Sequence, residues 1–211
     1  MSTAAFRKKL RRAEAALAEV DPALGRVIAR VGPCPLNPEP DFEPFNALLR
    51  SICFQQLHGK AAETIHRRVA TRLGDGEQVE LAQVLRARLP TLRSCGLSES
   101  KAYAIKDLAL KTRAGVVPSS DALYALDDEA IISRLTEVRG VGRWTVEMLL
   151  MFHMGRLDIF PVDDFGVRKG FMRLRGLDEH PTAKALRPEG ARWAPWRTVA
   201  SWYLWRLADG R

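Results

Sequence analysis

Two neighbouring carboxylates, Asp163 and Asp164, stand just after Pro161 and just before a stretch with the apolar spacing of a helix. An aspartate at such a place commonly caps the helix that follows, and a cap occupies one carboxylate only. The second carboxylate of the pair is therefore a candidate for chemistry. Held in place, it can stabilise positive charge that develops on a substrate, and it can orient or deprotonate a water molecule.

Arg139 and Arg143 flank a short turn, Gly140, Val141 and Gly142, between two stretches with helical periodicity. Glycines let the backbone turn tightly and approach a ligand closely. The helix after the turn begins with unpaired N–H groups and the positive end of its dipole. These groups and the two arginines are expected to hold a phosphate of a nucleic-acid backbone. An ordinary turn between two helices is the alternative interpretation.

The charge balance agrees with a polyanionic partner. The 211 residues include 33 Lys and Arg against 25 Asp and Glu, which gives a formal net charge of +8 at pH 7. A basic surface of this size attracts polyanions, and nucleic acid is the commonest of them. A soluble basic protein without such a partner would have the same composition, so charge alone does not decide the function.

The elements that must position these residues are expected to be helices. Apolar residues three and four positions apart recur through most of the chain, and no series of alternating apolar and polar residues indicates a sheet. A proline-rich stretch over residues 35–44 has the composition of a linker. We expect an all-α protein with helices over residues 10–20, 23–31, 45–54, 61–73, 81–88, 98–114, 120–126, 128–135, 144–154, 165–173 and 196–208.

Several other classes of protein are disfavoured. No apolar run reaches the roughly 18 residues of a membrane helix, and residues 1–20 lack the apolar core of a signal peptide. Cys34, Cys53 and Cys95 stand far apart, so neither a disulfide framework nor a zinc or iron–sulfur centre is indicated. We expect a cytoplasmic protein with reduced thiols, no membrane association and no resident cofactor.

Taken together, the motifs resemble those of the helix–hairpin–helix DNA glycosylase superfamily, and within it the 3-methyladenine DNA glycosylase II branch. Residues 138–145 (Val-Arg-Gly-Val-Gly-Arg-Trp-Thr) match the family's phosphate-binding hairpin. Residues 160–168 (Phe-Pro-Val-Asp-Asp-Phe-Gly-Val-Arg) match the segment that carries its catalytic aspartate. Residues 52–62, 95–103 and 196–205 match further blocks, so the resemblance covers nearly the whole chain.

The resemblance implies roles for the aspartates and for a DNA wedge. The second aspartate of the family's pair is catalytic, which is Asp164 here, and Asp163 would be structural. The family's Gln-Gln segment carries a loop that pushes a side chain into the DNA stack, so Gln56 or Leu57 is the candidate wedge. The alternative is that both residues simply pack at the end of a helix.

Three residues are candidates for the pocket that receives the flipped base. Trp144 begins the helix after the hairpin, Met148 lies one turn along, and the resemblance places Trp205 opposite Trp144. Aromatic faces bind a flat cation well, and an alkylated purine carries a positive charge. Such a base leaves as a neutral molecule without a proton donor, so alkylated bases such as 3-methyladenine and 7-methylguanine are the expected substrates. The other tryptophans are expected in the core: Trp193, Trp196 and Trp202.

The resemblance also separates monofunctional glycosylases from bifunctional glycosylase/lyases. Members that nick the DNA strand have a lysine two residues after the second glycine of the hairpin, where this chain has Trp144. A nucleophilic amine is missing at that place, so we expect a monofunctional hydrolase that initiates base excision repair. A bifunctional glycosylase/lyase is one alternative. A catalytically silent DNA-binding module is the other, although such a module needs neither Asp164 nor the two pocket tryptophans.

We expect two helical lobes with the active-site cleft and the DNA between them. Residues 45–162 would form the lobe with the hairpin, and residues 1–44 together with 163–211 would form the other, which places Asp164 at the junction. The expected partner is double-stranded DNA that contains damaged bases, bound by a monomer in the cytoplasm, on the nucleoid if the source is bacterial. The resemblance suggests one ion, a monovalent cation at the hairpin carbonyls when DNA is bound.

Overall fold

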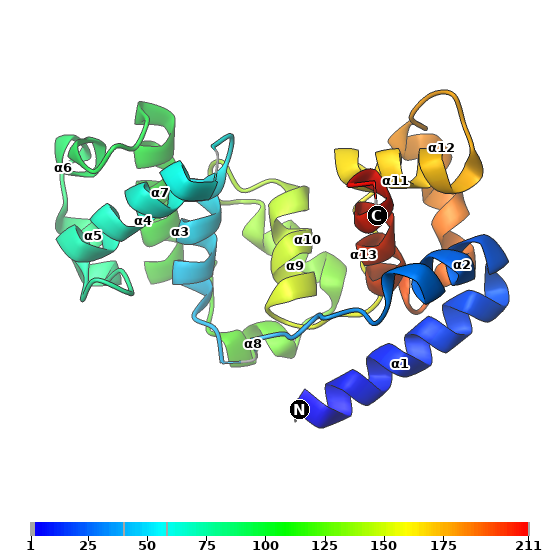
Figure 1. The fold of residues 1–211 in the computed structure, drawn as a ribbon. Helices are drawn as coiled ribbons and strands as arrows, with labels where there is room; N and C mark the ends of the chain where they lie inside the picture. The colour runs from blue at the N-terminus through cyan, green and yellow to red at the C-terminus, as the bar shows by residue number, and fades with distance from the viewer. Residues whose placement is uncertain (1–2, 40, 58, 211) are drawn as a thin grey trace. The chain divides into compact units, whose positions relative to one another are not determined.

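The computed structural model describes residues 3–39, 41–57 and 59–210, and the regular elements within these ranges are helices (Figure 1). Extended pairing among the described residues is limited to an isolated bridge between Gly74 and Val79. The all-α class predicted from the sequence is therefore confirmed. None of the described helices combines the length and the apolar character that crossing a bilayer requires.

Most of the helices lie where the apolar periodicity predicts them. Two short helices, α6 and α12, and the 3-10 helix η1 were not expected from the sequence. In chain order the elements are α1 (Thr3–Val20), α2 (Pro22–Val31), α3 (Pro44–Phe54), α4 (Gly59–Leu73), α5 (Leu81–Arg86), α6 (Leu89–Ser94), α7 (Glu99–Arg113), α8 (Ser120–Tyr124), α9 (Asp128–Leu135), α10 (Arg143–Phe152), α11 (Phe165–Arg175), α12 (Ala183–Glu189), η1 (Gly190–Trp193) and α13 (Arg197–Ala208).

The chain divides into two compact units. Unit 1 comprises Met1–Pro40 and Leu150–Arg211, and unit 2 comprises Asp41–Leu149. We expected the lobe with the hairpin to span residues 45–162, so residues 41–44 and 150–162 belong to the other unit than predicted. Hydrogen bonds to α13 explain the difference at residues 150–162, because Thr198 binds the segment before α11.

Thr198 makes three hydrogen bonds to this segment. Its hydroxyl donates to the carbonyl of Arg156 at 2.7 Å and accepts from the N–H of Ile159 at 3.0 Å. Its own N–H donates to the carbonyl of Leu157 at 3.0 Å. Buried backbone groups need such partners, so these bonds attach the segment to α13.

Unit 1 is built around the close packing of α11 on α13, which lie side by side in Figure 1. A Cβ on Gly170 would lie 1.9 Å from the carbonyl oxygen of Leu204, so the two helices meet at a distance that only glycine permits. The surrounding core includes the buried side chains of Phe6, Leu17, Leu24, Phe171, Trp193 and Tyr203.

The buried carboxylate of Asp21 binds the C-terminal end of α11 to the same core through hydrogen bonds. Asp21 caps α2 through the N–H of Leu24 at 3.2 Å, and it also accepts hydrogen bonds from Arg175 and from the indole of Trp193. Burial alone would raise the pKa of Asp21, but the hydrogen bonds from Arg175, Trp193 and Leu24 and the charge of Arg175 hold it below its usual value.

Unit 2 is arranged around α7, which contacts α3, α5 and α6. Apolar residues of α3 and α7 at helical spacing supply much of its core, as the periodicity predicts. The buried side chains of these two helices include Phe45, Leu48, Leu49, Ile52, Ile105 and Leu108.

Candidate active site

Asp164 is the N-cap residue of α11, and its carboxylate accepts hydrogen bonds from two helices. Its Oδ1 accepts the backbone N–H of Val167 at 2.7 Å and the indole N–H of Trp205 at 2.8 Å. The side chain is partly buried. One donor comes from its own helix and the other from α13, so the orientation of the carboxylate depends on the packing of α11 on α13.

Trp205 reaches Asp164 because the first turn of α11 has no side chain in its path. A Cβ on Gly166 would lie 2.7 Å from Cδ1 of the Trp205 ring and 3.1 Å from Oδ1 of Asp164. On α10 the ring of Phe152 stacks on Trp205, with centroids 5.8 Å apart and planes inclined by 22°. Sequence reasoning missed both Gly166 and Phe152. A glycine in the first turn of a helix, where it costs stability, was the available signal for the first.

Asp163 does not have the structural role that the resemblance implies. Its side chain is exposed and makes no hydrogen bond or ion pair with another described residue. The structural contact, the cap of α11, belongs to Asp164 itself. Asp163 therefore serves best as a matched control for Asp164.

The hairpin forms the expected tight turn in unit 2. Val138 and Val141 are buried and anchor the turn, while Arg139, Gly140 and Gly142 are exposed. The N–H of Val141 donates to the carbonyl of Val138 at 3.0 Å, and Gly140 has a φ of 78°, in the left-handed region that favours glycine. The turn is thus presented to solvent just before the N-terminus of α10.

Helix α7 holds the hairpin in place. The carboxylate of Asp107 accepts the N–H of Arg139 at 2.8 Å, and the guanidinium of Arg139 lies 4.9 Å from the ring centroid of Tyr103. A Cβ on Gly140 would lie 3.3 Å from Cβ of Ala104, so the turn sits close against the helix. The guanidinium of Arg139 has no carboxylate partner among the described residues.

The second arginine of the hairpin, which we expected to bind a phosphate, binds two carboxylates of the protein itself. The guanidinium of Arg143 donates to Glu129 at 3.0 Å and to Glu147 at 3.0 Å. These bonds, that to Glu129 first, raise the pKa of Arg143 above its usual value. With two carboxylates already beside it, Arg143 is less suited to a phosphate than Arg139 is.

Trp144 and Met148 lie one turn apart on α10 in unit 2. The indole of Trp144 is 45% exposed, and Met148 is partly buried. Residues at this spacing share one face of a helix, so the pair offers an apolar surface beside the hairpin. Trp205 lies in unit 1, and its position opposite Trp144 stays a prediction.

Of the remaining tryptophans, which we expected in the core, one is a core residue and two pack against the core from its edge. Trp193 is fully buried and meets the ring of Phe160 edge-on at 5.6 Å. Trp196 and Trp202 are partly buried and pack against the same cluster.

The expected wedge lies in a tight turn directly after α3. Gln56 and Leu57 are exposed, Leu57 by 41%. Gln56 has a φ of 55°, a left-handed conformation that costs a residue with a side chain roughly 1–2 kcal/mol. The preceding Gln55 donates its amide N–H to the carbonyl of Gly140 at 2.8 Å, which joins the turn to the hairpin. Sequence reasoning did not single out Gln55.

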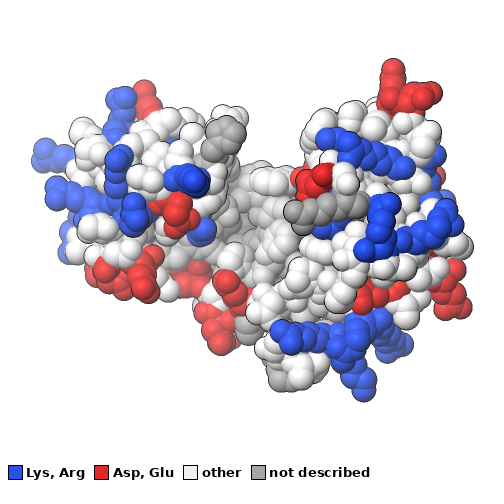
Figure 2. Space-filling model, in the orientation of Figure 1, with Lys and Arg blue, Asp and Glu red and all other residues white. Residues whose placement is uncertain are grey.

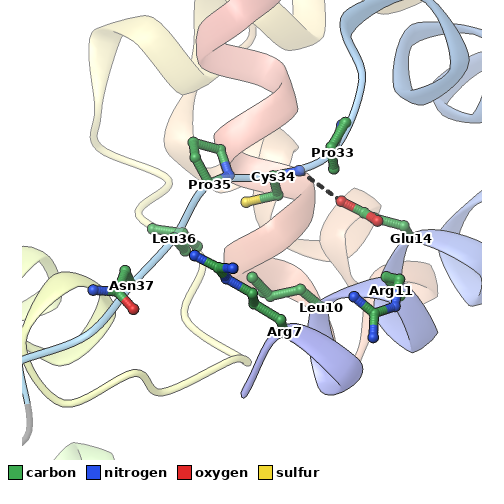
Figure 3. A pocket seen from close by; sticks show the side chains of 9 residues that line it. All are labelled: Arg7, Leu10, Arg11, Glu14, Pro33, Cys34, Pro35, Leu36 and Asn37. Atoms are coloured by element: carbon green, nitrogen blue, oxygen red, sulfur yellow. Dashed lines mark hydrogen bonds between the residues drawn. The ribbon is translucent and has the colours of Figure 1, made fainter. Parts of the chain in front are cut away.

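The cysteines offer no competing nucleophile. Burial raises the pKa of Cys34 and of Cys53 to about 12, and a protonated buried thiol is inert. Cys34 borders a hollow of about 420 Å³ beside α1, where its N–H donates to Glu14 at 2.7 Å (Figure 3). No residue of the expected site lines this hollow. Among the residues described, no group of His, Cys, Asp and Glu side chains could hold a metal ion.

The glycine-containing turn between α9 and α10 is a helix–hairpin–helix element, and the aspartate that caps α11 follows it in the chain. The family model for the HhH-GPD superfamily base excision DNA repair protein matches residues 49–195. The chain belongs to this family, and the resemblance drawn from its motifs is confirmed.

Two curated relatives come from Schizosaccharomyces pombe. The DNA-3-methyladenine glycosylase 1 is 38% identical over 170 residues, which cover 79% of this chain and 75% of the relative. The alkylbase DNA glycosidase-like protein mag2 is 31% identical over 198 residues, which cover 93% of each.

Solved structures give the same family. The 3-methyladenine DNA glycosylase of Schizosaccharomyces pombe in complex with abasic DNA has a TM-score of 0.82 at 35% identity, over 92% of this chain and 95% of that one. The DNA-3-methyladenine glycosidase of Bacillus halodurans has a TM-score of 0.81 at 35% identity, over 92% and 87%.

Proposed function

We propose that this protein is a monofunctional DNA glycosylase that hydrolyses the N-glycosidic bond of alkylated bases and so initiates base excision repair. The observation that carries the proposal is the carboxylate of Asp164, fixed by the N–H groups of Val167 and Trp205. The names of the relatives given above, a DNA-3-methyladenine glycosylase, an alkylbase DNA glycosidase-like protein and a DNA-3-methyladenine glycosidase, support the substrate class.

Asp164 stabilises the positive charge that the sugar gains as the bond to the base breaks. The hydrogen bonds from Val167 and Trp205 orient the carboxylate before the substrate arrives, so no reorganisation is needed in the transition state. The same carboxylate orients or deprotonates the water that attacks the sugar. An alkylated purine already carries the charge that makes it a good leaving group, so the step needs no proton donor.

The base must leave the duplex stack before it can react. We assign the wedge that fills its place to Gln56 or Leu57, which are both exposed in the turn after α3. Trp144, with Met148 beside it, and Trp205 are the proposed stacking surfaces for the flipped base. A cationic base on an aromatic face gains about 0.5–2 kcal/mol from the cation–π interaction.

The absence of a hairpin lysine favours hydrolysis over strand cleavage. Strand-nicking relatives place an amine two residues after the second hairpin glycine, and Trp144 occupies that position here. An indole cannot form a Schiff base with the sugar. The product is therefore an abasic site in an intact strand.

The surface charge supports DNA as the partner. Lys and Arg side chains gather along α1 on the face that Figure 2 shows. We propose that the protein acts as a monomer on double-stranded DNA with damaged bases, in the compartment that holds the chromosome. It uses no organic or redox cofactor, and the hairpin carbonyls are the groups that would bridge a monovalent cation to a phosphate. The exposed cations of α1 are Arg7, Lys8, Lys9, Arg11 and Arg12.

Arg139→Ala is expected to weaken binding to damaged and undamaged duplexes alike. The slope of log Kd against log salt should fall by about 0.9, the contribution of one phosphate contact. Arg143→Ala is the matched control, since its guanidinium is bound to Glu129 and Glu147. It should lower the melting temperature and leave the salt slope unchanged. Equal slope changes in the two variants would contradict this assignment, and a loss confined to damaged DNA would mean that Arg139 reads the base.

The proposed function is tested by incubating the protein with duplex DNA methylated at random and resolving the released bases by chromatography. We expect free 3-methyladenine and 7-methylguanine, and no unmodified purine at a comparable rate. A chain that binds this DNA with high affinity yet releases no base would be the catalytically silent module instead.

A further inference from the structure

We propose that Lys101 is a positioning residue that holds the turn of residues 55–57 in the conformation that presents the wedge to DNA. The inference rests on the proposed function and adds to it a role for α7. The ammonium of Lys101 donates to the carbonyl of Cys53 at 2.9 Å and to the carbonyl of Gln55 at 2.6 Å. These carbonyls end α3, where the helix itself supplies no partner.

The turn needs an external support because it is strained. Gln56 is the one non-glycine residue with positive φ in the described part of the chain. Such a conformation persists only where the surroundings fix it, and it is commonly found where a loop acts on a ligand. Lys101 binds the residue directly before Gln56, so it fixes the backbone at the point where the strain begins.

The same helix also fixes the hairpin, so turn and hairpin share one support. Gln55 links the turn to the carbonyl of Gly140, and Asp107 on α7 holds the N–H of Arg139. These hydrogen bonds form a network that joins Lys101 to the turn, the turn to the hairpin, and the hairpin back to α7. Each of its hydrogen bonds is 2.9 Å long or shorter.

This hydrogen-bond network orders the wedge before DNA binds, which favours base flipping. When the hairpin binds a phosphate, the turn is already fixed relative to the hairpin. The free energy of binding is therefore not used to order the wedge. That energy is then available for unstacking the damaged nucleotide, which is costlier in a paired duplex than opposite an abasic site. Burial lowers the pKa of the Lys101 ammonium, and its two carbonyl partners offset the cost of keeping the charge there.

The chain offers a matched control five residues along the same helix. Lys106 donates to the carbonyls of Val84, Leu85 and Ala87 at 3.0, 2.9 and 2.9 Å. It binds carbonyls at the end of α5 as Lys101 binds those at the end of α3, but among the described residues no hydrogen bond joins it to the turn or the hairpin. Removing Lys106 therefore reproduces the loss of a partly buried ammonium that binds helix-end carbonyls, at a place away from the wedge.

The test compares Lys101→Met with Lys106→Met on two duplexes that contain one 7-methylguanine. In the first duplex the lesion is paired with cytosine, and in the second it faces an abasic analogue, where no base pair has to break. Single-turnover excision by Lys101→Met should fall at least about 10-fold on the paired lesion, within the range that misplacement of a remote group causes. On the unpaired lesion it should fall less than about 3-fold, because the flipping penalty is smaller there. For Lys106→Met, the ratio of the excision rate on the unpaired lesion to that on the paired lesion should equal the wild-type ratio, whatever the melting temperature of the variant.

Equal ratios for Lys101→Met, Lys106→Met and the wild type would overturn the inference and leave Lys101 a purely structural residue. If Lys101→Met does not fold, Gln55→Leu takes its place, because it removes the hydrogen bond from Gln55 to Gly140. Its excision rate should fall selectively on the paired lesion. A wild-type ratio of the two rates in Gln55→Leu would also overturn the inference. Lys101→Arg, which keeps a cation near the carbonyls, should recover part of the loss. Absence of excision by the wild type would count against the proposed function rather than against Lys101.

Discussion

Asp164→Asn is expected to lower the single-turnover excision of 7-methylguanine by at least about 100-fold, the scale on which one preorganised electrostatic group acts. The amide has the shape of the carboxylate but no negative charge to stabilise the sugar cation. Its carbonyl oxygen can still accept the N–H groups of Val167 and Trp205, so the cap of α11 and the position of the indole are retained. Affinity for DNA with an abasic site and the melting temperature should change little.

Asp163→Asn is the control for this substitution. The neighbouring carboxylate is exposed, has no partner among the described residues, and carries the same charge. It should excise at a rate close to that of the wild type. Similar losses in both variants would mean that general negative charge matters rather than the fixed carboxylate of Asp164.

Cationic lesions should be excised at least about 100-fold faster than 8-oxoguanine in the same duplex, because a missing proton donor costs about 10²- to 10⁴-fold. Asp164 stabilises the charge on the sugar only, and no residue placed at the site protonates a leaving base. The positive ring of 3-methyladenine or 7-methylguanine supplies that help itself and also binds better to the exposed indole of Trp144. Rates measured with each lesion at saturating protein give the ratio directly.

Efficient release of 8-oxoguanine would contradict this selectivity and require an acid. His180 is the first residue to replace in that case, since its ring lies 5.0 Å from that of Phe165, the residue after Asp164. Phe165 is itself 60% exposed. A rate for 8-oxoguanine that falls in His180→Phe, with 7-methylguanine unaffected, would identify the donor.

Helices with a clear apolar stripe could be predicted from the sequence, and the short ones could not. α6 contains Pro90 near its start and α12 contains Pro188 in its interior, and each spans fewer than two full turns of periodic pattern. Proline disfavours a helix interior, so local signals argue against α12 in particular. Its buried Leu186 joins the core of unit 1, and this tertiary contact is invisible in a local window.

The place of Asp164 at the start of a helix, after the hairpin in the chain, could be predicted because the hairpin and the aspartate segment are local sequence motifs. Its bond to Trp205 spans 41 residues and depends on the helix packing that Gly166 permits, which no pattern reveals. The carboxylate partners of Arg143 were not foreseen because flanking arginines look equivalent in sequence. The acidic Glu147 four residues later was a visible sign of an ion pair within α10.

The central claim is hydrolysis of one N-glycosidic bond by Asp164 without cleavage of the strand, and an end-labelled duplex with one 7-methylguanine tests it most directly. Under single-turnover conditions the wild type should release the free base and leave a strand that breaks only after hot alkali, and Asp164→Asn should do neither at a comparable rate. Borohydride should trap no protein–DNA adduct, because Trp144 stands where a reactive lysine would be. Strand cleavage without alkali, a trapped adduct, or equal base release by Asp164→Asn would contradict the account.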